Sequence, residues 1–269
     1  MKRTARIWLA SMCLSLVAAL MVSSMALSQE QKDAEAPKPG SDGFAAYILN
    51  KIDDLYRGTS SRGVMAMEIK TKHWNRSMEA ESWSLGTKYS LVRILKPSKE
   101  KGTATLKAND DLFMYLNKTG RTVKITSGMM GSSWMGSHFT NDDLVKGSRM
   151  AEDYVVQYEG ESKKGGIETC RLVLVPRPDA PVVWGKIEIT VRQTDLQPLE
   201  QRFYDEDGHE ARVLEFTNHK EVNGRTMPTK MTMRPLDKSG EFTSIVWKEI
   251  DFKVKLNKSF FTLQRLKSK

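Results

Sequence analysis

Apolar and polar residues follow a period of two along most of the chain after residue 60. The segment "GVMAMEIKTK" (63–72) places Met65, Met67 and Ile69 on alternate positions, and "EFTSIVWKEIDF" (241–252) has one apolar and one charged face. This alternation is typical of β-strands that bury one face and expose the other. Turns rich in glycine, asparagine and aspartate separate such segments at the short spacing of an antiparallel meander. The pattern therefore predicts about 11–12 antiparallel strands.

A helical period precedes these strands. From Phe44 to Tyr56 the apolar residues recur every three or four positions, after Ser41 or Asp42 as a possible N-cap and before Gly58 as a terminator. A long antiparallel sheet with one apolar face must curl on itself, and the amphipathic helix can cover its open side. We therefore expect a mainly β (α+β) fold, an incomplete and strongly curved antiparallel β-barrel with helices on the open side.

The first residues have the anatomy of a secretory signal peptide. A basic start is followed by the apolar run "IWLASMCLSLVAALMV" and then by small residues. Cleavage after Ala26 or after Ser28 fits a small-x-small rule. An uncleaved membrane anchor is the alternative, because the run approaches spanning length. We expect a signal peptide at 1–28, a disordered leader at 29–41 and a single domain at 42–269.

Cysteine usage and charge bear on the compartment and the partners. Cys13 lies in the predicted signal, and Met12 stands where a lipoprotein signal needs a small residue. The exported chain then has Cys170 alone, so it forms no internal disulfide. The net charge of +9 falls to +6 without the three basic residues of the first 28 positions. The basic residues are scattered, which argues against nucleic acid as a partner and predicts a mild attraction to anionic membranes.

Residues with catalytic or metal-binding chemistry occur without the spacing that such sites need. The four histidines are His73, His138, His209 and His219, none in a metal-binding motif, so we expect no metal and no other cofactor. The "GSSWMG" stretch lacks the G-x-S-x-G spacing of a nucleophile elbow. Ser133, His138 and Asp142 are close enough in sequence to form a triad, although such residues are more often loop and cap residues. We expect no enzyme; a hydrolase that uses Ser132 or Ser133 is kept as an alternative that serine-to-alanine changes would test.

The acidic residues after this stretch fit a helix N-terminus. Thr140 is a good N-cap, Asp143 three positions later resembles a capping box, and Phe139 can pack on Leu144 as a staple. We expect a short helix over 140–146 that ends at Gly147.

Methionine is frequent between residues 129 and 135. Met129, Met130 and Met135 stand with Trp134 among glycines, a composition that suits an adaptable cover over an apolar ligand better than a rigid core element. Core filling is the ordinary explanation for most of the other methionines of the exported chain.

Three stretches resemble the outer-membrane lipoprotein-sorting (LolA-like) proteins. "GSSWMGSHFTNDDL" (131–144) is similar to that family's glycine-, methionine- and aromatic-rich segment, "RILKPSKEKGTATLKANDDLFMYL" (93–116) to its "KP…KGTA-L…W-YL" run, and "LNKSFFTLQRL" (256–266) to its C-terminal ending. Phe113 stands where the family often has tryptophan, a conservative departure. The resemblance covers about 60–265.

The resemblance implies a curved half-barrel, plugged by helices, that binds acyl chains in the periplasm. It also implies an inner-membrane transporter or permease as lipid donor, with an outer-membrane acceptor possible. Our leading hypothesis is a non-enzymatic carrier of lipid or lipoprotein acyl chains, monomeric when free. A periplasmic accessory or sensor module docked on an inner-membrane transporter is the alternative.

Two groups of residues are the candidate lipid site. The expected cavity wall consists of Met65, Met67, Trp83 and Leu91, and the expected lid or gate of Met129, Met130, Trp134, Met135, Phe139 and Leu144. Because the side-chain period of a strand is two, a one-residue error would place a wall residue on the opposite face.

Overall fold

All strands among the described residues belong to one antiparallel sheet. The computed structural model describes residues 37–55, 57–146 and 150–268. Its strands are β1 (Ser60–Lys70), β2 (Asn75–Leu85), β3 (Tyr89–Lys96), β4 (Ala104–Ala108), β5 (Asp111–Leu116), β6 (Arg121–Ile125), β7 (Tyr154–Lys164), β8 (Ile167–Pro176), β9 (Lys186–Arg192), β10 (Pro198–Tyr204), β11 (Glu210–Val222), β12 (Arg225–Pro235) and β13 (Phe242–Asp251). The predicted mainly β fold with a curled, open antiparallel sheet is confirmed, with 13 strands in the part described.

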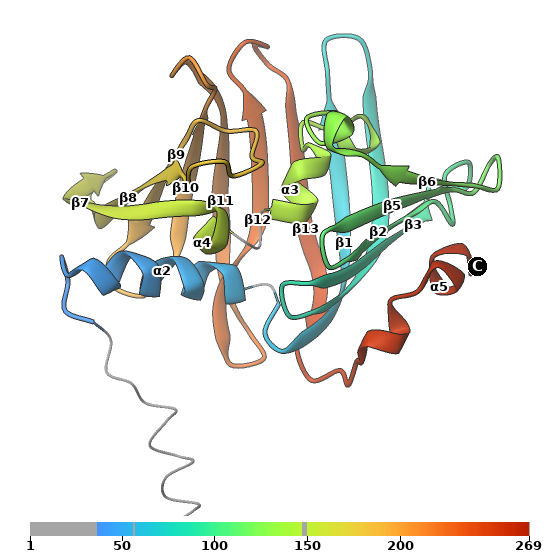
Figure 1. Ribbon diagram of the computed structural model, residues 1–269, viewed down its shortest axis with the longest axis horizontal. Coiled ribbons are helices and arrows are strands. Elements are labelled where there is room, and N and C mark those ends of the chain that lie inside the picture. The colour runs from blue at the N-terminus through green and yellow to red at the C-terminus, as the bar shows by residue number, and fades with distance from the viewer. Residues whose placement is uncertain (1–36, 56, 147–149, 269) are drawn as a thin grey trace, which may run out of the picture. The chain divides into compact units, whose positions relative to one another are not determined.

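The strand order explains how the open side is closed. The sheet runs β6-β5-β4-β3-β2-β1-β13-β12-β11-β10-β9-β8-β7, so the chain builds outward from β1 to one edge and later returns from the other edge to pair β13 with β1. The residues that follow β6 and precede β7 therefore connect the two edges. They contain the short helices η1 (Ser127–Met129), η2 (Trp134–Gly136), α3 (Asn141–Lys146) and α4 (Met150–Asp153). Figure 1 shows α3 and α4 on the near side of the curled sheet. We call residues 126–146 the crossing segment.

The two faces of the sheet differ as the alternation predicts. The inner face, toward α2 and the crossing segment, carries the main apolar core, where Met65 pairs with Ala80 and Leu214 pairs with Met233. The outer face carries ion pairs between neighbouring strands, such as Arg234 with Glu215. The core therefore lies inside the curl, on one face of the sheet.

Helix α2 (Asp42–Asp54) covers part of the inner face, as expected for the amphipathic stretch (Figure 1). Its residues Ile48 and Leu49 are fully buried, and the ring of Phe44 packs edge-on against Tyr158 of β7 at 5.6 Å. Ser41 occupies the N-cap position, but its side chain makes no capping hydrogen bond. Packing of the apolar stripe on the sheet, rather than capping, holds this helix.

A smaller apolar cluster lies on the outer face of β2–β4. The C-terminal helices η3 (Lys258–Phe260) and α5 (Leu263–Lys267) lie beside it, and it contains Trp83, Leu91, Leu106, Phe261 and Leu266. Arg93 fixes α5 by donating a 2.6 Å hydrogen bond to the carbonyl oxygen of Arg265. The family-like "SFFTLQRL" ending thus packs outside the curl.

Three predictions fall wholly or largely outside the part of the chain that is described. The predicted signal peptide and most of the predicted leader precede residue 37, and Gly147, the expected helix terminator, is also outside the described residues. Within the described ranges, no helix combines the length and the apolar character needed to cross a membrane.

Candidate functional site

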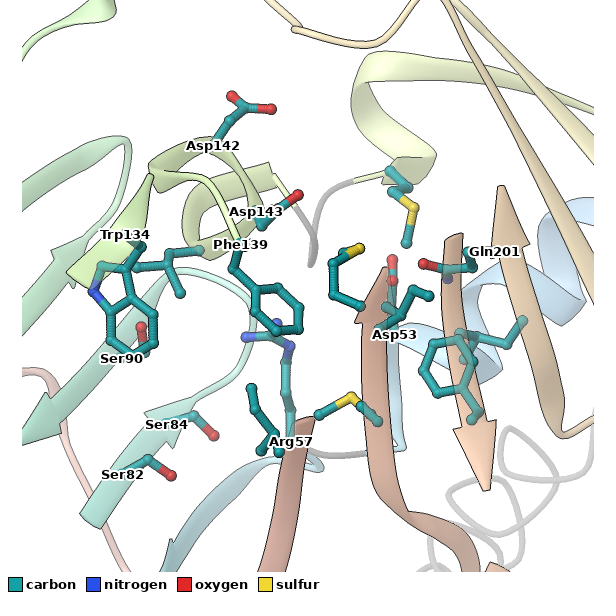
Figure 2. A pocket seen from close by; sticks show the side chains of 18 of the residues that line it. Asp53, Arg57, Ser82, Ser84, Ser90, Trp134, Phe139, Asp142, Asp143 and Gln201 are labelled. Carbon is teal, nitrogen blue, oxygen red and sulfur yellow. The ribbon is translucent and has the colours of Figure 1, made fainter. Parts of the chain in front are cut away.

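A cavity of about 280 Å³ lies between the inner face of the sheet and the elements that cover it. Side chains from both halves of the sheet, from α2 and from the crossing segment line it. Figure 2 shows a row of serines on one wall, Asp53 and Gln201 across from them, and Asp142 and Asp143 at the α3 end. This volume is at the lower end of the range for small-molecule pockets.

One wall of the cavity is apolar and rich in methionine. Met65 comes from β1, and Phe216, Met231 and Ile245 are cross-strand neighbours on β11, β12 and β13. Flexible thioether chains and a phenyl ring fit a variable apolar ligand without specific polar contacts.

The opposite wall is made of small hydroxyl residues. Ser82 and Ser84 of β2, Ser90 of β3 and Ser61 of β1 line it, and the hydroxyls of Ser61 and Ser84 lie 2.7 Å apart. Larger side chains at these inward positions would fill the space. The serines are therefore part of the reason that a cavity exists here.

The crossing segment is held over the cavity by polar contacts to several strands. The indole Nε1 of Trp134 donates to Thr105 Oγ1 of β4 at 3.1 Å, and Arg76 of β2 donates to the carbonyl oxygen of Met135. Met135 has a φ of 53°, an unfavourable value for a residue other than glycine. These contacts hold the loop in a conformation that its sequence alone would not favour.

The end of the crossing segment is fixed by Asp143. The backbone N–H of Thr140 donates to Asp143 Oδ2 at 2.7 Å, and the N–H of Asp143 donates to Thr140 Oγ1 at 3.2 Å, which confirms the predicted capping box. Arg212 of β11 donates to both carboxylate oxygens of Asp143, at 2.8 and 2.5 Å. The Arg212 guanidinium also lies 4.1 Å from the ring centre of Trp184 and 4.3 Å from that of Phe203. We call this arrangement the Asp143–Arg212 clamp.

The possible triad is not assembled. Ser133 donates its hydroxyl hydrogen bond to the carbonyl oxygen of Ser137. The two ring nitrogens of His138 lie 2.8 Å from Thr243 Oγ1 and 3.1 Å from Glu241 Oε2, on or beside β13. His138 thus links the crossing segment to the sheet, and its ring nitrogens face neither Ser133 nor Asp142.

A second acid and arginine lie at the end of α2. Asp53 and Arg57 line the cavity and also a neighbouring pocket of about 360 Å³, which Thr87 and Glu152 help to line. Burial is the main cause that raises the pKa of Asp53 to about 7; the charge of Glu152 adds to the rise, and the charges of Arg57 and Lys107 oppose it. Burial also lowers the pKa of Arg57, against the influence of Asp53. Arginine nevertheless keeps its charge at neutral pH.

The four predicted wall residues lie in different places. Met65 lines the cavity, and Met67 is buried in the same core cluster as Met65. Trp83 borders the cavity between Ser82 and Ser84, but its side chain packs on the other face of β2. Leu91 is fully buried with the Trp83 side chain in the cluster next to α5, while its neighbours Ser90 and Val92 line the cavity. Leu91 therefore points away from the cavity, as strand alternation requires once Ser90 and Val92 face inward.

The six predicted lid residues are also divided. Trp134, Phe139 and Leu144 line the cavity. Met135 packs against the main core cluster and Met130 against a small cluster of Leu112 and Ile125, whereas Met129 has 37% of its surface exposed.

The described residues contain one group with metal-ligand geometry, Asp205, Asp207 and His209. It lies in the turn after β10, where Asp205 Oδ1 accepts backbone hydrogen bonds from Asp207 and His209. A turn explains this arrangement without an ion.

Sequence reasoning did not identify Asp53, Arg57 or Arg212 as site residues. A signal for the first two exists, because Leu49, Asp53 and Arg57 are spaced by four and therefore share one helical face. Charged residues that continue an apolar stripe indicate a buried polar site. Arg212 gives no comparable local signal, since its partner is 69 positions away.

Comparisons with solved structures find the same fold in several proteins, of which three are described next. A DUF1329 family protein from Desulfovibrio piger has a TM-score of 0.76 and 20% identity over 84% of this chain and 98% of its own. A domain described as an outer membrane lipoprotein-sorting protein, from Vibrio parahaemolyticus, has a TM-score of 0.73 and 21% identity over 85% of this chain and 100% of its own. For a LolA superfamily protein from Nitrosomonas europaea, the TM-score is 0.70 with 21% identity, over 82% of this chain and 98% of its own.

The predicted resemblance to lipoprotein-sorting proteins is thus confirmed at the level of the fold. A search of curated proteins finds no match to the chain. A family model described as an uncharacterized protein matches residues 86–268, about two thirds of the chain. The chain therefore belongs to this family of uncharacterized proteins and has the LolA-like fold.

Proposed function

We propose that the chain is a non-enzymatic carrier that holds the acyl chain of a lipid or lipoprotein in the cavity. The observation that carries this proposal is a cavity with a methionine-rich wall, placed between a curled sheet and a crossing segment. Burial of each methylene group contributes about 0.8 kcal/mol, so an acyl chain gains affinity there from burial alone.

The sequence and the fold together support a route of transport for this carrier. The predicted signal peptide would place the carrier in the periplasm, and outer membrane lipoprotein sorting is the description of one structural neighbour. An inner-membrane transporter or permease would then load the cavity, and an outer-membrane acceptor would receive the chain. The free carrier would be a monomer. The crossing segment would move during loading, and its residues Trp134 and Phe139 line the cavity.

Narrowing the cavity tests the proposal. Ser82→Phe fills the small-residue wall, and Ser77→Phe is the matched control, since Ser77 is exposed on the same strand. Native mass spectrometry of protein purified from its own periplasm should show bound lipid. A fluorescent acyl probe should bind Ser82→Phe about tenfold or more weakly than the wild type, and Ser77→Phe with unchanged affinity. Absence of lipid and of probe binding in the wild type would contradict the carrier.

A further inference from the structure

The charged end of the cavity adjoins a second, more polar pocket. Asp53 and Arg57 line both the apolar cavity and the pocket of about 360 Å³ next to it. The other residues of that pocket include Asn50, Thr87 and Glu152. A single amphiphile could therefore place its chain on one side of Arg57 and its head group on the other. Figure 2 shows Arg57 and Asp53 among the side chains that line the cavity.

Arg57 has no ionic partner in the described part of the chain. Its guanidinium makes neither an ion pair nor a side-chain hydrogen bond there, although it is largely withdrawn from water. The next acid, Asp54, is paired with Arg225 at 3.1 Å instead. A desolvated cation without a partner is costly, and a bound anion would remove that cost.

Asp53 offsets this cation only in part, because the two residues form no ion pair in the described part of the chain. Its Oδ1 is buried without a hydrogen-bond partner, and a pKa of about 7 leaves the carboxyl only partly ionised near neutral pH. A second cation, Lys107, lies close enough to lower the pKa of Asp53. Lys107 is almost fully buried and donates to the carbonyl oxygen of Thr87 at 2.7 Å. Glu152 is the opposing acidic charge that faces Asp53 from α4.

We propose that Arg57 is the anchor for the anionic head group of an amphiphile whose acyl chain occupies the cavity. The inference rests on the proposed function and adds the ligand class. The ligand would carry a carboxylate or phosphate group, and the planar guanidinium suits two-point recognition of such groups. A fatty acid and a phospholipid share this chemistry. An amphiphile with an uncharged head group does not, and it would leave Arg57 without a partner.

Ligands that share one chain and differ in the head group test the anchor. Lipid-free protein is titrated at pH 7.5 with hexadecanoic acid, with a single-chain phosphatidic acid of the same length and with hexadecanol, by displacement of the acyl probe; inorganic phosphate alone is a further competitor. The wild type should prefer the anionic amphiphiles over the alcohol, and inorganic phosphate should not displace the probe. Whichever of the two anionic compounds binds more tightly identifies the head group.

The variants separate this inference from the proposed function. Arg57→Gln should weaken the binding of the anionic amphiphiles about tenfold or more, since a charge-assisted contact is lost. The affinity for hexadecanol should change less than about twofold. Arg57→Lys should recover part of the loss, and Arg225→Gln, which changes a nearby arginine paired with Asp54, should bind as the wild type does. Equal loss for acid and alcohol, or no preference in the wild type, would overturn the anchor and leave the carrier standing. Failure of every amphiphile to bind the wild type would overturn both.

Discussion

The two acid–arginine pairs that lie on the cavity differ in almost every respect. Asp143 and Arg212 join α3 to β11 through two hydrogen bonds of 2.8 and 2.5 Å, and the arginine is covered by two aromatic rings. Asp53 and Arg57 stand one turn apart on and just after α2, feel each other's charge and make no ion pair within the described residues. The same two residue types thus form a hydrogen-bonded ion pair in the clamp and remain without such a contact at the end of α2.

This difference indicates that the two acid–arginine pairs have different roles. A buried, bidentate pair fixes one geometry, and the Asp143–Arg212 clamp fixes the end of the crossing segment over the sheet. An arginine without an ion pair beside a carboxyl of raised pKa fits the anionic head group proposed above. In the proposed carrier, the clamp would set the resting form and Arg57 would contact the ligand.

The largest effect is expected from Arg212→Met. The change leaves Asp143 largely buried without its partner, and removal of one member of a buried pair typically costs about 3–5 kcal/mol. Urea unfolding monitored by tryptophan fluorescence measures the loss. Arg234→Met, which breaks the exposed pair with Glu215 on the outer face, is the control and should cost less than about 1 kcal/mol. Equal losses for the two variants would show that the clamp is no stronger than a surface ion pair.

Asp53→Asn should change how stability depends on pH. The folded-state pKa of about 7 lies above the ordinary 3.8, so between these values the folded protein holds a proton that the unfolded chain has released. The wild type therefore loses stability as pH rises from 4 to 7, and the variant lacks this loss. The unfolding free energy of the variant relative to the wild type should increase by about 1–3 kcal/mol from pH 4 to pH 8. A parallel pH dependence in both proteins would show that Asp53 titrates normally.

The sequence predicted the parts of this molecule that depend on local pattern. Strand alternation predicted the sheet, the Leu49 stripe predicted α2, and the Thr140–Asp143 spacing predicted a capping box that forms as expected. Faces were harder to assign, because Trp83 and Leu91 are apolar enough for either side of β2 and β3. Their side chains pack next to α5, which a pattern confined to single strands does not reveal.

The candidate site depends on contacts between residues that are distant in sequence. This explains why the sequence did not predict the position of the crossing segment or the cavity. The crossing segment has a loop composition, yet Trp134 reaches β4 and His138 reaches β13. Its position follows from the strand order, which places β6 and β7 at opposite edges. Serines at inward positions also look like weak strand formers in sequence, and only the paired register shows that they leave a cavity.

The smallest effect on stability is expected at Arg57, where the largest effect on ligand binding is proposed. Arg57→Met replaces a desolvated cation that makes no ion pair in the described residues with an apolar side chain, an exchange that is often neutral or stabilising. The unfolding free energy of lipid-free protein at pH 6 should therefore change by less than about 1 kcal/mol, because Asp53 is then mainly protonated and needs no counter-charge. The same urea titrations as for Arg212→Met provide the measurement. A loss comparable to that of Arg212→Met would mean that Arg57 already has a structural partner in the folded protein. The two ends of the cavity would then be alike, and the need for an anionic ligand would disappear.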